Sequence, residues 1–150
     1  MDANFVILAP IEEQIMPFGA AEEQILQAAT NYLTLIEKAN ELVGQVPDGV
    51  ITGSASSIYL KKLGHRALKS EEIEAIIKAL GTEEDKQALD AFRQAQEDIS
   101  QRLQNTKNIG LVLRQAKIPY DQVYKRSKRT DLWKPEQMIQ IMEVLKRLQL

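Results

Sequence analysis

The sequence predicts an all-helical protein, and two observations support this fold class. Apolar residues recur at three- and four-residue spacing through most of the 150-residue chain, as they do along one side of an α-helix. The alternation of apolar and polar residues that marks a half-buried strand is weak. With 44% hydrophobic residues, the chain is long enough to bury one core or two smaller ones.

The first expected element is a helix from Ala20 to Val43. Its apolar residues fall on one stripe and are Ile25, Ala28, Ala29, Tyr32, Leu35, Ile36, Ala39, Leu42 and Val43. The segment from Gly44 to Ser57 is rich in glycine and serine and contains Pro47, so a loop or a chain of turns is expected there.

Two longer helices are expected between residues 70 and 106. One covers Ser70 to Leu80, with Ser70 as a single capping residue, since the position three residues on holds Ile73 and a full capping box is therefore absent. The next begins after Thr82, a capping residue, and carries only a narrow apolar line. Such a helix packs along one neighbour or connects two units, and a dimer seam is the second interpretation.

An internal repeat is the most informative feature of the sequence. A shift of 65 residues, without gaps, superposes Ser57–Leu80 on Gln122–Leu145 and places Tyr59 on Tyr124. Both copies have the pattern of a short helix, a basic stretch, a bulky apolar residue and an amphipathic helix that begins Lys-(Ser/Pro)-Glu. The chain is therefore predicted to hold two similar helical units.

Another helix, Asn108 to Lys117, is expected directly before the second copy. Its inward-facing residues are Ile109, Val112, Leu113 and Ala116. A tight turn at Lys117-Ile118-Pro119 then leads into a short basic helix over Tyr120–Arg129.

This arrangement resembles the helix-turn-helix of the phage-repressor (XRE-type) family, in which the second helix enters the major groove of DNA. Ala116, Ile118 and Val123 match the family's small, turn-aliphatic and mid-helix aliphatic positions. The resemblance covers roughly 108–148, and in the first copy only about 56–80. The chain departs from the pattern at Lys117, where the family usually has glycine, at Leu113 and at Arg126.

The predicted organisation is thus one of tandem helix-turn-helix-like units joined by a long amphipathic helix. It comprises an N-terminal arm (1–18), a helical unit with the first copy (19–81), a connecting helix (82–106) and a basic unit (107–150). Within the last unit we expect Trp133 to be a core plug between the last two helices, with Met138 and Met142 in the core.

The resemblance implies DNA contacts from the helix around 120–129. Cations suit phosphates, and forked or amide side chains suit base edges. The candidates are Tyr120, Gln122, Tyr124, Lys125, Arg126, Ser127, Lys128 and Arg129, with Gln122 and Ser127 as base readers. Between Asp48 and Glu71 the first copy has no acidic residue, and this basic window adds Lys61, Lys62 and Arg66 as candidates, with His65 expected at the surface or in a loop.

The charge is unevenly distributed along the chain. Residues 107–150 hold ten basic and four acidic side chains, a net +6, whereas residues 1–106 hold nine basic and seventeen acidic ones, a net −8. A basic region beside an acidic one suits a nucleic acid, an acidic protein or a neighbouring subunit.

Composition argues against catalysis. The absence of cysteine removes disulfides and thiolate chemistry and fits a cytoplasmic protein. With one histidine and no phosphate-binding loop motif, we expect no enzyme, no cofactor and no metal. No secretory signal and no run of about 20 apolar residues is seen, so no membrane partner is expected.

Two functions remain as expectations. The first is a DNA-binding transcriptional regulator whose partner is duplex DNA, as a homodimer if Thr82–Thr106 or the N-terminal helix forms a seam. The alternative is a non-enzymatic protein-interaction adaptor that presents the basic helix Lys125–Arg129 to an acidic protein partner.

Overall fold

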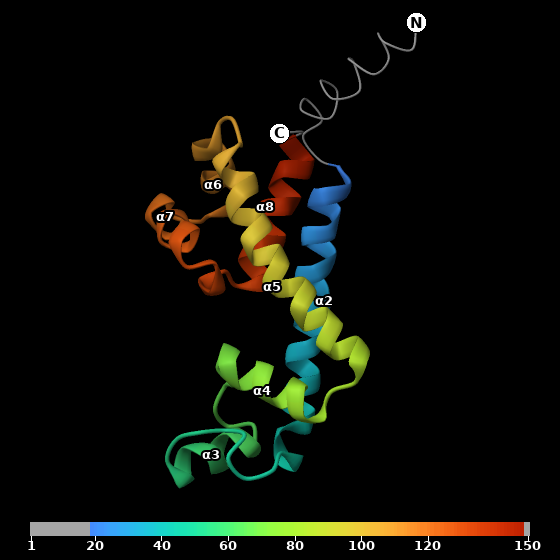
Figure 1. Ribbon diagram of the computed structural model, residues 1–150. Helices are drawn as coiled ribbons and strands as arrows, with labels where there is room; N and C mark the ends of the chain where they lie inside the picture. Colours follow the sequence, from blue (N-terminus) through green and yellow to red (C-terminus); the bar gives the residue numbers. More distant parts are fainter. Residues whose placement is uncertain (1–18, 149–150) are drawn as a thin grey trace, which may run out of the picture. The chain divides into compact units, whose positions relative to one another are not determined.

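A computed structural model describes residues 19–148 and confirms the all-helical fold class (Figure 1). Within this range there are α-helices and two short 3-10 helices, and no strand. The elements are α2 (Ala20–Leu42), η1 (Val43–Gln45), α3 (Ala55–Lys62), α4 (Ser70–Leu80), α5 (Glu83–Gln104), α6 (Ile109–Ala116), α7 (Tyr120–Lys128), η2 (Thr130–Leu132) and α8 (Pro135–Leu148). The N-terminal arm predicted over 1–18 lies outside the described residues.

The chain divides into two compact units. The central unit is Thr30–Arg93, and the terminal unit combines the described residues of Met1–Ala29 and Gln94–Leu150. The boundaries fall inside the long helices α2 and α5, so each of these helices contributes residues to both cores.

The core of the central unit combines the predicted apolar stripes with Val46 and Ile51, which lie in the segment expected to be a loop. Its buried apolar residues are Tyr32, Leu35, Ala39, Val43, Val46, Ile51, Ile73, Ile76, Ile77, Leu89 and Phe92. The rings of Tyr32 and Phe92 stack with their centroids 3.7 Å apart. The hydroxyl of Tyr32 is buried and has no hydrogen-bond partner among the described residues.

The ends of the helices show which capping expectations hold. Thr82 and Asp85 exchange two hydrogen bonds, of 2.8 and 3.2 Å, which confirms Thr82 as the cap of α5. The expectation for α4 was wrong, because the carboxylate of Glu72 accepts a 2.8 Å hydrogen bond from the backbone N–H of Lys69. The cap is therefore one residue earlier, and Ser70 is the first residue of the helix.

The terminal unit is organised around Trp133. Its side chain is buried, its indole N–H donates a 2.7 Å hydrogen bond to Oγ of Ser100, and its backbone carbonyl accepts one of 2.8 Å from Gln96. Met138 and Met142 are also buried, which confirms all three residues as core. Figure 1 shows α6, α7 and α8 beside the second half of α5.

The element boundaries follow the 65-residue repeat. Helices α3 and α7 begin at Ala55 and Tyr120, and α4 and α8 begin at 70 and 135. In both copies the backbone N–H before the second helix donates to a side-chain oxygen three residues on, from Lys69 to Glu72 and from Lys134 to Gln137. The two copies differ in what precedes them. Helix α6 precedes α7 in the second copy, whereas η1 and a series of turns precede α3 in the first.

Candidate nucleic-acid interface

The turn between α6 and α7 is closed by a left-handed residue, Lys117. Lys117 adopts a left-handed conformation with φ 60°, and the N–H of Ile118 donates a 2.9 Å hydrogen bond to the carbonyl of Leu113. A residue with a side chain takes this conformation at a cost of roughly 1–2 kcal/mol. Lys117 therefore keeps the backbone conformation for which glycine is usually selected.

Buried aliphatic side chains hold α6 and α7 in place. Ala116, Ile118 and Val123, the three residues that carry the resemblance, are all buried. Val123 is the only buried residue of α7, so the rest of this short helix is wholly or partly open to solvent.

The residues of α7 fall into three groups around Val123. Because successive residues turn by about 100°, Asp121, Lys125 and Lys128 lie opposite it, and all three are exposed. Tyr120 and Tyr124 form one flank and are 64% and 60% exposed. The other flank contains Gln122 and Arg126, which are half-buried.

Gln122, expected to read bases, and Arg126, expected to contact DNA, are both engaged within the protein. The guanidinium of Arg126 lies over the Trp133 ring, 5.4 Å from its centroid, and donates hydrogen bonds to the carbonyl of Leu132 and to Oε1 of Gln122. The same Gln122 oxygen accepts a hydrogen bond from Gln137. Burial lowers the pKa of Arg126, an effect partly opposed by Asp121. These two side chains hold α7 against the rest of the unit.

The remaining candidates on and beside α7 differ in whether they already form ion pairs or hydrogen bonds within the protein. Arg129 is exposed but forms a 2.7 Å ion pair with Asp131, which raises the pKa of the arginine. Ser127 is half-buried and donates to the carbonyl of Tyr124. Among residues 19–148, Lys125 and Lys128 form no ion pair, although the Lys128 ammonium lies 4.8 Å from the centroid of the Tyr124 ring.

In the first copy, Lys61 is buried rather than exposed to a partner. Its ammonium forms a 2.7 Å ion pair with Glu72, and both side chains are only 7% exposed. Hydrogen bonds from Lys61 and from the Lys69 backbone lower the pKa of Glu72, although burial, the largest single effect, raises it. Lys62 is half-buried, and Arg66 is exposed and donates to Oγ of Ser57. His65 is exposed, as expected.

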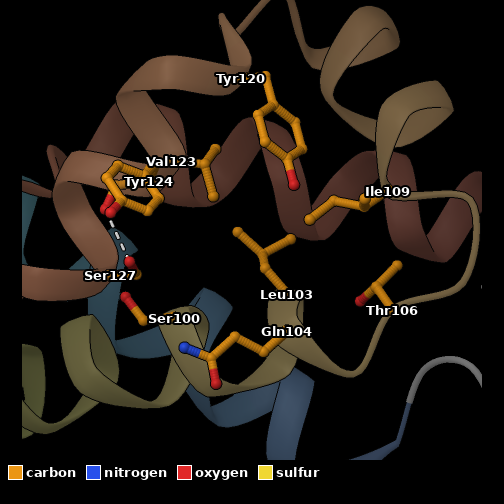
Figure 2. A pocket seen from close by; sticks show the side chains of 9 residues that line it. All are labelled: Ser100, Leu103, Gln104, Thr106, Ile109, Tyr120, Val123, Tyr124 and Ser127. Atoms are coloured by element: carbon orange, nitrogen blue, oxygen red, sulfur yellow. Dashed lines mark hydrogen bonds between the residues drawn. The ribbon is translucent and has the colours of Figure 1, made fainter.

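A pocket beside α7 was not anticipated from the sequence (Figure 2). It has a volume of about 310 Å³ and is named here the α5–α7 pocket. Its lining residues are Ser100, Leu103, Gln104, Thr106, Ile109, Tyr120, Val123, Tyr124 and Ser127. No sequence signal reveals it, because its walls come from separate segments that meet only in the folded unit.

Residues 19–148 contain no cluster of three or more histidine or acidic side chains suited to a metal ion. None of the helices in this range has the length and apolar character to cross a bilayer. No protein family, curated protein or solved structure matches the chain.

Proposed function

We propose that the protein binds duplex DNA through α7 and acts as a transcriptional regulator. The observation that carries this proposal is the outer face of α7, which follows a left-handed turn. Lys125 and Lys128 are exposed there, and neither forms an ion pair with any residue of 19–148. Exposed lysines suit phosphates, the source of most affinity for DNA.

Charge and side-chain chemistry support the same proposal. Residues 107–150 carry a net +6, which attracts a polyanion to this part of the chain. On the outer face of α7, Asp121 only accepts hydrogen bonds, which suits the amino group of cytosine in the major groove. Tyr120 and Tyr124 add exposed hydroxyl groups at its edge.

The test is a fluorescence-anisotropy titration of the full chain against a labelled random-sequence duplex at about 50 and 200 mM salt. The variant is Lys125→Ala/Lys128→Ala, which removes two exposed charges and no packing contact of the core. Lys78→Ala/Lys86→Ala, on α4 and α5, is the control with the same change in charge. Arg126→Ala is unsuitable because Arg126 packs on Trp133.

For the wild type, we expect log affinity to fall with log salt at about −0.9 for each phosphate contacted. The α7 variant should lose roughly two units of this slope, and the control should keep it. Salt-independent binding, or no binding at low salt by a folded protein, would contradict the proposal. The second result would leave an acidic protein as the partner of α7.

A further inference from the structure

We propose that the α5–α7 pocket is a binding site for an uncharged, aromatic small molecule. The pocket lies within the terminal unit, between the end of α5, the start of α6 and one flank of α7 (Figure 2). Two of its walls, Tyr120 and Tyr124, belong to the exposed surface of α7, so a bound molecule would cover part of that helix.

The lining of the pocket contains no charged side chain, and this favours an uncharged ligand. None of the nine lining residues is an acidic or basic residue, although Lys125 and Lys128 are close to them in sequence and residues 107–150 carry a net +6. A site for an anion would be expected to place such cations in its wall. The lining therefore favours a neutral ligand.

The polar groups of the pocket are largely engaged within the protein. The hydroxyl of Ser100 accepts from the Trp133 indole, that of Thr106 donates to the carbonyl of Arg102, and that of Ser127 donates to the carbonyl of Tyr124. The hydroxyls of Tyr120 and Tyr124 and the amide of the exposed Gln104 make no hydrogen bond shown within residues 19–148, so they are available to a ligand. A ligand with one or two hydrogen-bonding groups on a mainly apolar body fits this supply.

Shape and size favour an aromatic body. The aliphatic side chains of Leu103, Ile109 and Val123 line the pocket beside the rings of Tyr120 and Tyr124, and Figure 2 shows these five side chains around one hollow. Aromatic rings pack well against one another in offset or edge-on arrangements. A volume of about 310 Å³ lies at the lower end of small-molecule sites, which limits the ligand to about three rings.

The test uses N-phenyl-1-naphthylamine, an uncharged probe whose emission rises in apolar surroundings, with the full chain and no DNA present. The result is therefore independent of the proposed DNA binding. Tyr124→Ala removes one wall of the pocket. Tyr59→Ala is the matched control, because Tyr59 is equivalent to Tyr124 in the repeat, is 63% exposed and does not line this pocket.

We expect saturable binding to the wild type, roughly tenfold weaker binding to Tyr124→Ala and unchanged binding to Tyr59→Ala. Neutral 2-naphthol should displace the probe, whereas the 2-naphthoate anion should not. Circular dichroism checks that both variants are folded. The proposal is overturned by the absence of saturable binding, by equal losses in the two tyrosine variants, or by displacement that is as strong with naphthoate as with naphthol.

Discussion

Replacing Lys61 by methionine tests the buried ion pair of the central unit. Methionine keeps most of the apolar volume of the lysine stem, so the change removes the charge without opening a large cavity. The Glu72 carboxylate stays buried, and of its two hydrogen bonds within residues 19–148 only the one from the Lys69 backbone N–H is kept. The free energy of unfolding is therefore expected to fall.

The magnitude follows from the burial of the pair. Both side chains are 7% exposed and their charged atoms are 2.7 Å apart, so solvent screens the interaction little. Removing one partner of such a pair costs about 3–5 kcal/mol, a large part of the roughly 5–15 kcal/mol that stabilises a typical domain. Glu72→Gln should also destabilise, because it strands the Lys61 ammonium while its amide oxygen still accepts from Lys69.

The assay is urea unfolding followed by far-UV circular dichroism, for both single variants and for Lys61→Met/Glu72→Gln. The double variant has no stranded charge, so it should recover at least about 2 kcal/mol relative to Lys61→Met. A double variant that loses the sum of both single effects would refute the reasoning, because the two charges would then act independently.

The dependence on pH provides a second readout of the same pair. The pKa of Glu72 lies below the ordinary value of 4.5 in the folded protein, so folding favours the ionised carboxylate. Its contribution is present above the unfolded pKa and is lost as pH falls through the folded pKa. Below pH 4.5 the wild type should lose stability more steeply than Lys61→Met/Glu72→Gln.

Three further variants test the packing of each unit by urea unfolding. Ser100→Ala removes the acceptor of the buried Trp133 indole N–H and should cost about 1–3 kcal/mol; an unchanged unfolding midpoint would contradict that role. Tyr32→Phe removes a buried hydroxyl without a partner and should stabilise by up to about 1 kcal/mol, whereas a clear loss would mean that the hydroxyl is hydrogen-bonded. Gln137→Glu places a carboxylate near Arg126, in the way that Glu72 lies near Lys61 in the first copy. The free energy of unfolding should rise by roughly 0.5–1 kcal/mol at low salt, and this gain should disappear at high salt.

Local chemistry accounts for the parts of the fold that could be predicted. The spacing of apolar residues identifies the buried side of each helix, because residues three or four positions apart lie on the same side of a helix. The cap at Thr82 and the turn at Lys117 depend on residues a few positions apart, so both are visible in sequence. The 65-residue repeat predicted where α3, α4, α7 and α8 lie, because the pattern that repeats is also made of residues close together in the sequence.

The candidate site was only partly predictable, because a cation in a sequence carries no sign of its partner. Lys61, Lys125 and Arg126 all belong to short basic helices, yet their surroundings differ. Lys61 is neutralised by a carboxylate from α4 and Arg126 lies on the Trp133 ring, whereas Lys125 is exposed. The choice among them depends on which residues of the next helix pack against each side chain.

By itself, then, the sequence determined the helices, their buried sides and the basic character of α7. Only the tertiary structure decided which of its side chains are available to a partner, and it alone formed the α5–α7 pocket. Periodicity and capping act within one turn of helix, whereas ion pairs, ring contacts and pockets join residues distant in the chain, such as Ser100 and Trp133.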